Sequence, residues 1–216
     1  MEAILTPYAT VKPAHRRSRS VTRIGLERAL LRQFARLEPG VVLDVGSKAS
    51  PYKDRIPHTR YLRLDLDPRT APDLCCDVQA IDCADAQFDA LIATEVLEHI
   101  LEPQRAVDEM WRVLRPGGVC IASTRFLYPY HPDPRDYYRF TWDSLAHLFR
   151  RFTQVEVIPH GNRLQAVWSL LDHGIARGIL RPFNPLIARV NFERTRVPLG
   201  FVVFAKRGSQ DDTEPA

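Results

Sequence analysis

Long apolar runs and paired cysteines are both missing from this 216-residue sequence. No run approaches the ~20 apolar residues that a membrane-spanning helix needs, and the first residues lack the apolar core of a signal peptide. The four cysteines form no C-x-x-C pair, which argues against a dithiol redox motif or a zinc framework, so we expect reduced thiols. A chain that is 45% apolar and 26% charged can still bury one substantial core. We therefore predict a soluble, cytoplasmic protein with a single main domain.

Acidic residues are scarce in the first 36 positions, where only Glu2 and Glu27 oppose eight basic residues. This stretch has a net charge of +6 within a chain whose total is +4, so the basicity belongs to the N-terminus. Residues 1–23 are predicted to form a basic arm, with its arginines concentrated in HRRSRS. Such an arm can attract nucleic acid or anionic lipid, but a solvated terminus explains the same charge. We interpret it as solvated and expect no nucleic-acid partner.

Glycine is equally scarce at the position where a nucleotide-binding loop would need it. Residues 41–52 read VVLDVGSKASPY, an apolar strand followed by a loop whose only glycine is Gly46. A dinucleotide needs G-x-G-x-x-G, because backbone amides must approach its pyrophosphate closely, so a nicotinamide oxidoreductase is disfavoured. Twenty-one positions after Asp44, a second strand within YLRLDLDP ends at Asp65. Open α/β sheets hold a nucleoside with this layout, and a single glycine favours a cofactor without phosphates.

Strand and helix patterns alternate along the rest of the sequence, as a doubly wound α/β sheet requires. Leu26, Leu30, Phe34 and Leu37 share one face of a leader helix. We expect this helix to cover the sheet. The early edge of the sheet should be thinly covered, and either this helix or a second subunit could cover it. A further helix is expected over 103–114. Strands are expected at 41–45, 60–66, 73–78, 88–93 and 118–124, and then in TQVEVIP and VPLGFVVFAKR.

The sequence around these strands is similar to class I S-adenosylmethionine-dependent methyltransferases of the small, type 11-like group. Asp44, Gly46, Pro51 and Tyr52 match their motif I. The stretch from CCDVQ through EVLEH to RVLRPGG is similar to the middle of the same domain. The resemblance implies a Rossmann-like methyltransferase sheet that is mostly parallel and has an antiparallel last strand.

The resemblance also implies S-adenosylmethionine as the cofactor and gives it a binding site. Asp65 would accept two hydrogen bonds from the ribose hydroxyls, and Asp77 one from the adenine amino group, beside the amide of Val78. Gly46 leaves room for the methionine part of the cofactor, and Lys48 stands where a glycine is usual. The expected cofactor-binding residues are Asp44, Val45, Gly46, Ser47, Asp65, Leu66, Asp77, Val78 and Glu95.

The segment EVLEH allows two interpretations. On a helix, Glu95, Glu98 and His99 fall at i, i+3 and i+4 and share one face near the strand ends. Some methyltransferases, including certain small-RNA 3′-end enzymes and some that modify quinone precursors, bind a divalent metal with such an arrangement. Many small methyltransferases carry EVLEH without a metal, and there the first glutamate lies near the cofactor. We adopt the second interpretation and predict no metal ligand.

A loop rich in proline and aromatic residues follows the fifth strand and is predicted to bind the methyl acceptor. Its sequence, RFLYPYHPDPRDYYRFTWDSL, resembles a loop of methyltransferases encoded near sugar and cell-envelope pathways. His131 is the expected general base, because an imidazole with a pKa near ~6.5 suits removal of a hydroxyl proton; a turn contact is its alternative role. Tyr137 is the second expected catalytic residue. The other polar members of the loop are Tyr128, Asp136 and Arg139.

A helix is also expected near the C-terminus, where Leu164, Val167, Trp168, Leu171 and Ile175 share one face. We expect this face to be buried, with the helix and the following ILRPFNPLIARV capping the acceptor pocket. Contact with a membrane surface is the alternative, since arginines flank the apolar residues.

Together these patterns predict a methyltransferase domain over 24–207, between the basic arm and a disordered tail at 208–216. The expected reaction is methyl transfer to an oxygen, in preference to a nitrogen, of a small-molecule acceptor such as a sugar, a lipid-linked or a secondary-metabolite intermediate. Two alternatives stay open: a catalytically silent S-adenosylmethionine-binding module, and an RNA methyltransferase that uses the basic arm. A homodimer is also left open.

Overall fold

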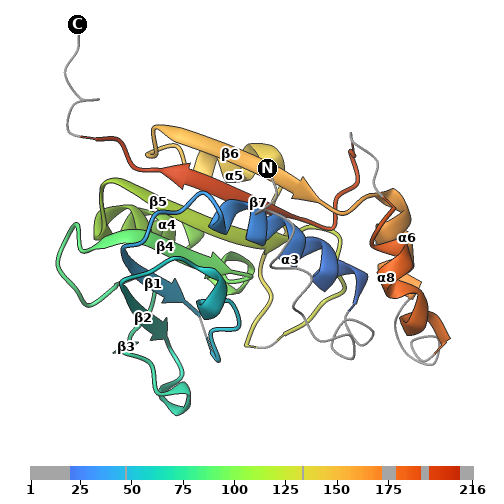
Figure 1. Ribbon diagram of the computed structural model, residues 1–216, viewed down its shortest axis with the longest axis horizontal. Coiled ribbons are helices and arrows are strands. Elements are labelled where there is room, and N and C mark those ends of the chain that lie inside the picture. Colours follow the sequence, from blue (N-terminus) through green and yellow to red (C-terminus); the bar gives the residue numbers. More distant parts are fainter. Residues whose placement is uncertain (1–19, 47, 133, 172–178, 191–194, 210–216) are drawn as a thin grey trace, which may run out of the picture.

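A seven-stranded sheet forms the centre of the computed structural model, which describes residues 20–46, 48–132, 134–171, 179–190 and 195–209 (Figure 1). The strand order is β3-β2-β1-β4-β5-β7-β6. The strands are β1 Val41–Val45, β2 Arg60–Asp65, β3 Leu74–Cys75, β4 Phe88–Thr94, β5 Leu114–Arg125, β6 Gln154–His160 and β7 Gly200–Lys206.

The sheet is parallel except around its last strand. Both neighbours of β1 run parallel to it, as do β3 to β2 and β5 to β4. β7 is antiparallel to β5 and to β6, which confirms the expected Rossmann-like sheet. Because β2 and β4 lie on opposite sides of β1, the strand order reverses there, and α/β sheets bind their ligands at such a point, beyond the carboxyl ends of the strands.

Burial and length differ from strand to strand. β1, β4 and β7 are apolar and almost wholly buried, as strands covered on both faces must be. β3 pairs with β2 only through Leu74 and Cys75, so it is shorter than the expected 73–78. The residues of RPGG lie within β5, where the pairing with β4 shifts its register between Phe88 and Ala90.

The leader helix is α3, Val21–Phe34, which begins at the capping residue Ser20. The Ser20 hydroxyl accepts a hydrogen bond from the Arg23 amide and so satisfies one of the free amides of the first turn. Residues 21–23 therefore belong to the helix and not to the basic arm, and residues 1–19 lie outside the described part of the chain.

One face of α3 packs on the sheet. Leu26, Leu30 and Phe34 lie in an apolar cluster with Ile92 of β4 and Ile121 of β5. The described residues of this cluster include none from β3. The leader helix therefore covers the middle of the sheet, and its described apolar cluster does not extend to β3.

The opposite face of the sheet is covered by α4, Pro103–Val113, and α5, Trp142–Leu148. α4 buries an apolar stripe against the sheet, and the expected helix over 103–114 is confirmed to within one residue. Thr141 caps α5 by accepting a hydrogen bond from the Ser144 amide, and the Ser144 hydroxyl accepts one from the Thr141 amide. The stripe of α4 consists of Ala106, Val107, Met110 and Val113.

Near the C-terminus, α6, η4 and α8 lie beside α3 (Figure 1). Their bounds are α6 Arg163–Leu171, η4 Arg181–Phe183 and α8 Asn184–Ile187. The remaining short turns are η1 Lys53–Arg55, η2 Pro68–Thr70 and η3 Leu97–His99. Among the described residues, no helix has both the length and the apolarity to cross a membrane.

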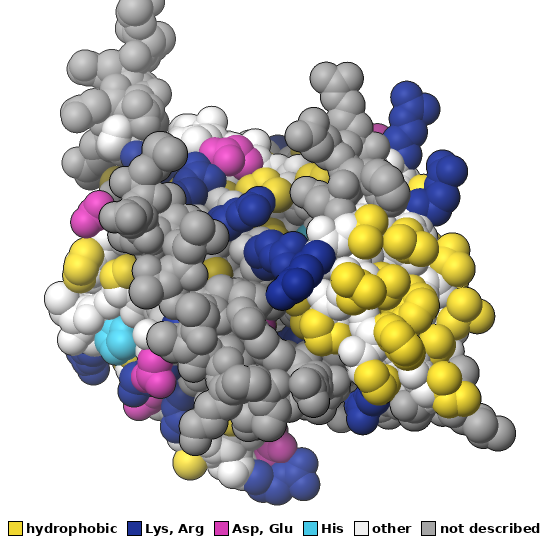
Figure 2. All heavy atoms as spheres, turned by 45° about the vertical axis from the view of Figure 1, so that its right-hand side comes forward, with side chains coloured by type: hydrophobic (Ala, Val, Ile, Leu, Met, Phe, Trp, Pro, Cys, Tyr) yellow, Lys and Arg dark blue, Asp and Glu magenta, His cyan; other side chains and the backbone are white. Residues whose placement is uncertain are grey.

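The expected helix after β6 forms, but its predicted buried face is wrong. Leu164, Val167 and Leu171 are exposed, and their side chains belong to a broad apolar area on this side of the molecule (Figure 2). Ile175 lies outside the described residues. Polar side chains of α6 occupy the buried positions instead.

Candidate functional site

A cavity of about 200 Å³ lies at the carboxyl ends of β1, β2 and β4. Seven of the nine expected cofactor residues line it, although they come from four separate stretches of sequence. These seven are Val45, Gly46, Asp65, Leu66, Asp77, Val78 and Glu95. The rest of the lining is Lys48, Leu64, Cys76, Val96, His99, Ile100 and Pro134. Ser47 lies outside the described residues.

Asp65, the last residue of β2, is the best-placed acceptor in this cavity. Its Oδ2 accepts a hydrogen bond of 3.0 Å from the Lys48 amide, and its Oδ1 one of 3.0 Å from the Asp67 amide. These two bonds fix the carboxylate and leave a lone pair on each oxygen. Asp65 can therefore still accept two hydrogen bonds from a pair of hydroxyl groups.

The loop after β1 depends on left-handed backbone positions. Gly46 has φ +62°, and a Cβ there would lie 2.8 Å from Cγ2 of Val96, so only glycine fits without moving the cavity wall. Lys48 has φ 42°, in the region that glycine favours. Lys48, which replaces the usual glycine, thus keeps the backbone conformation that a glycine would have. In this conformation the Lys48 amide donates its hydrogen bond to Asp65.

Asp44 lies behind the cavity rather than in its lining. It is buried, and its Oδ2 accepts a hydrogen bond of 2.6 Å from the Tyr61 hydroxyl. Burial raises the pKa of Asp44 to about 6, against the hydrogen bond from the Tyr61 hydroxyl, which lowers it. Asp44 therefore ties β1 to β2.

Asp77 closes the turn that carries Val78 into the cavity. Its Oδ1 accepts from the Gln79 amide and its Oδ2 from Gln79 Nε2, both at 2.9 Å. Val78 is almost fully buried. Asp77 thus lines the cavity and also holds this turn through its carboxylate.

The segment 95–99 does not form the expected helix. Glu95 has φ 57°, and its amide donates to the Ser123 carbonyl at 3.0 Å. Only Leu97–His99 make a single 3₁₀ turn, η3. A left-handed residue between strand and turn interrupts the helical period, so spacing alone does not place Glu95 with Glu98 and His99.

Arg125, at the end of β5, joins the two glutamates instead. Its Nε lies 2.7 Å from Glu95 Oε2 and 3.7 Å from Glu98 Oε1. Glu98 is fully buried, and burial together with the charge of Glu95 holds its pKa above the ordinary value. The Thr124 hydroxyl donates to Glu98 Oε2 at 3.0 Å. Sequence reasoning missed Arg125, whose only signal is a charge at the end of an otherwise apolar strand.

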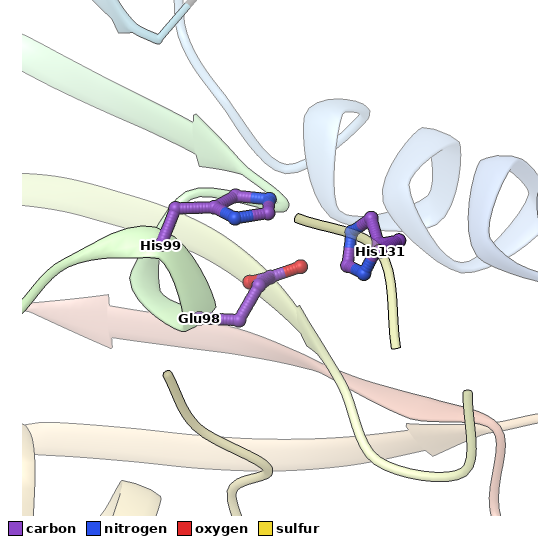
Figure 3. Close-up of side chains that lie close together, drawn as sticks. All are labelled: Glu98, His99 and His131. Carbon is purple, nitrogen blue, oxygen red and sulfur yellow. The ribbon is translucent and has the colours of Figure 1, made fainter. Parts of the chain in front are cut away.

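Glu98, His99 and His131 face one another from η3 and from the loop after β5 (Figure 3). One ligand atom from each lies within 4.8 Å of the others, so this trio, with His131 in place of Glu95, is the set that could hold a divalent metal. Carboxylate with imidazole is a permissive ligand set, and the charge of Arg125 already lies 3.7 Å from Glu98. The absence of a metal ligand stays a prediction.

His131 is held by a second carboxylate. Asp136 Oδ2 accepts from the His131 amide at 3.0 Å and lies 3.2 Å from His131 Nδ1. Both terminal nitrogens of Arg139 donate hydrogen bonds to the same carboxylate, and this holds the pKa of Asp136 well below its usual range. With Nδ1 directed at an ionised carboxylate, Nε2 of His131 is the nitrogen left to exchange protons with other groups.

Tyr137 takes part through its backbone. Its amide donates to the Glu98 carbonyl at 2.8 Å, which ties the acceptor loop to η3. Its side chain is exposed. Tyr128 lies closer to the trio, with its ring 5.1 Å from that of His131 and stacked under the Arg125 guanidinium at 3.7 Å.

The cavity suits a nucleoside that carries no phosphate. Carboxylates stand on two sides of it, at Asp65 and Asp77, and apolar walls come from Leu64, Val78 and Ile100. Lys48 is the only cation among its described lining residues, so a pyrophosphate would lack counter-charges. These hydrogen-bond acceptors and apolar walls therefore fit a ribose and an uncharged base.

The sheet order, the antiparallel β7 and the cavity at the strand ends together define a Rossmann-like methyltransferase fold. A family model described as "Methyltransferase domain" matches residues 43–122, from β1 into β5. A solved S-adenosylmethionine-dependent methyltransferase from Archaeoglobus fulgidus superimposes with a TM-score of 0.59 at 13% identity, over 85% of this chain and 94% of that one. The resemblance seen in the sequence is confirmed over residues 43–122 by the family model, and the solved structure confirms the fold.

Two curated relatives match shorter stretches. The chain is 35% identical over 109 residues to an uncharacterized methyltransferase of Mycobacteroides abscessus, which is 41% of each protein. It is 47% identical over 38 residues to the ubiquinone biosynthesis O-methyltransferase of Psychrobacter cryohalolentis, which is 18% of this chain and 15% of that protein. The chain therefore spans less than half the length of these relatives.

Proposed function

We propose that this protein transfers a methyl group from S-adenosylmethionine to an oxygen of a small-molecule acceptor. The observation that carries the proposal is the position of His99, which lines the cofactor cavity and also faces His131 and Glu98. The cavity and the polar groups of the acceptor loop are thus adjacent. The match of residues 43–122 to the methyltransferase domain supports the same function.

The cofactor is proposed to lie across the ends of β1, β2 and β4. Asp65 would accept hydrogen bonds from the ribose hydroxyls, and the turn of Asp77 and Val78 would meet the adenine. Gly46 would face the methionine part. When bound, S-adenosylmethionine supplies a methyl group on a positively charged sulfur, which is already a strong methyl donor.

The protein's own task is then to orient the acceptor and to take up its proton. Asp136 holds the Nδ1 side of His131, so His131 Nε2 would accept the hydroxyl proton as the oxygen forms its bond to the methyl carbon. Burial and the positive charge of Arg125 lower the pKa of His131, which keeps the ring neutral at pH 7 and able to act as a base. Tyr137 is proposed to contact the acceptor with its exposed ring.

Calorimetry with S-adenosylmethionine tests the proposed cofactor site. The wild-type chain is expected to bind, and Asp65→Ala to bind at least about 100-fold more weakly, because two hydrogen bonds to a carboxylate are lost. Asp67→Ala is the matched control, since Asp67 lies two residues away and is paired with Arg69 on the surface. Equal affinities for the two variants would refute the assignment.

Transfer itself is tested with S-adenosylmethionine labelled in the methyl group and a panel of small hydroxyl and amine compounds. Label in a hydroxyl compound supports the proposal. Label in amines alone would show that the acceptor atom is nitrogen. Label in RNA would favour an RNA methyltransferase whose basic arm contacts the RNA. Tight cofactor binding without any transfer would indicate a silent binding module.

A further inference from the structure

α6 has the reverse polarity of an ordinary surface helix. Its buried residues are Gln165, Ala166 and Ser169, whereas Leu170 and Leu171 are more than half exposed. A helix on the surface of a globular protein normally turns its apolar side chains inward and its polar ones to water. Here water-facing positions hold leucine and core-facing positions hold glutamine and serine.

Hydrogen bonds fix this reversed orientation. Gln165 Nε2 donates to the Val190 carbonyl at 2.8 Å and to the Ile187 carbonyl at 3.1 Å. The Ser169 and Thr22 hydroxyls lie 3.0 Å apart, which joins α6 to α3. Because buried polar groups are costly unless they are paired, rotating α6 to bury its leucines would break these bonds. The apolar side is therefore held outward.

The exposed side chains of this region form one area, which we call the α6–α8 face. It holds seven of the twelve large apolar side chains that are exposed in the described residues. Figure 2 shows them gathered in one broad patch. Contiguous apolar patches of this kind mark interaction sites. The members of the face are Leu164, Val167, Leu170, Leu171, Ile179, Phe183 and Leu186.

The surroundings of the α6–α8 face are basic. Among the described residues of 161–199 the charged side chains are four arginines, Arg163, Arg181, Arg189 and Arg196, and none of these described residues is acidic. A cavity of about 350 Å³ lies between α3, β6 and the inner sides of α6 and α8; it is lined by Arg28 and Arg32 and by no acidic residue among those described. Lysine and arginine side chains also lie around the edge of the apolar patch (Figure 2).

We propose that the α6–α8 face binds the surface of a bilayer that contains anionic lipids, with the leucines in the interface and the arginines on the headgroup phosphates. Apolar area together with basic residues is the combination that interfacial contact requires. A second copy of the chain fits less well, because a symmetric dimer brings the same patch together on both sides. The two basic rims would then repel each other.

Flotation of the full chain with vesicles tests this proposal. Wild type is expected to float with vesicles of equal parts phosphatidylcholine and phosphatidylglycerol, and to bind vesicles of phosphatidylcholine alone at least about tenfold less, because the anionic attraction is lost. The triple variant Leu170→Ser, Leu171→Ser, Leu186→Ser is expected to lose at least about tenfold in binding to the mixed vesicles. The variant should fold, because all three side chains are exposed.

Leu101→Ser is the matched control, because Leu101 is 57% exposed, as is Leu171, but lies outside the face. It should bind like wild type, and circular dichroism should show equal melting for all three proteins. Failure of wild type to float with the mixed vesicles, or equal flotation of the triple variant, would overturn the proposal. So would a lipid-free dimer, seen by light scattering, that the triple variant converts to monomer.

Discussion

The cofactor cavity and the acceptor loop are adjacent but are built in different ways. The cavity is formed by backbone at strand ends, with Gly46 and Lys48 in left-handed positions and Asp65 bonded to two amides. The acceptor side is formed by charged side chains that hold one another, as Arg125 holds Glu95 and Glu98, and Arg139 holds Asp136. Under the proposed function, the cavity provides the shape that binds the cofactor, and the loop provides the groups that exchange protons.

This difference assigns separate measurable roles to the two regions. Changes in the cavity should alter cofactor affinity, and changes in the acceptor loop should alter the rate of transfer while leaving affinity intact. A variant that altered cofactor affinity and the rate of transfer equally would contradict these separate roles.

His131→Ala is expected to have the largest effect on the acceptor side. Loss of a general base lowers kcat by about 10²–10⁴-fold, whereas the dissociation constant of S-adenosylmethionine should change less than about threefold, since His131 is not part of the described cavity lining. Steady-state kinetics with an acceptor found in the labelled panel, together with calorimetry, measure the two quantities.

His147→Ala, an exposed histidine on α5, is the control and should keep wild-type values of both. A parallel loss of cofactor affinity in His131→Ala would contradict the separation of roles. Activity that disappears on dialysis against EDTA and returns with Mg²⁺ would instead make His131 a metal ligand with Glu98 and His99.

The pH profile of kcat gives a second test of the acceptor side. A base must be neutral, so the rate rises as the pH rises through the pKa of His131. Burial and the nearby Arg125 and His99 lower that pKa, and Asp136 opposes them; the net shift is downward. The midpoint of the rise should therefore lie below the ordinary histidine value of about 6.5. A rate that still increased from pH 7 to pH 8 would exclude His131 as the group that titrates.

Much of the cavity was predictable from the sequence, because its residues stand at ends of strands with clear apolar patterns. Val45 and Asp65 end such strands and Glu95 follows one, and the parallel order of the sheet brings these ends together. The partners of Glu95 and Glu98 were not predictable, because Arg125 is distant in sequence and the helical spacing of EVLEH does not form. Ion pairs between distant segments leave no periodic pattern in the sequence.

For α6 the sequence predicted the helix but not its orientation. Its apolar period was found correctly, but the period alone does not say which side faces the core. The direction is set by where Gln165 and Ser169 find hydrogen-bond partners on α8 and α3, and that information lies in the tertiary structure.

Lys48→Gly is expected to have the smallest effect and refines the account of the cavity. A non-glycine residue in the left-handed region destabilises the folded state by about 1–2 kcal/mol, and glycine removes this strain. Glycine also raises the conformational entropy of the unfolded chain, which offsets part of the stabilisation. The net effect should be an increase of about 0.5–1 kcal/mol in the free energy of unfolding, measured with urea. Lys53→Gly, in η1, should destabilise by a similar amount, because glycine has no advantage there. Since the residue 48 amide still reaches Asp65, cofactor affinity should stay within about threefold; a larger loss would show that the lysine side chain itself contacts the cofactor.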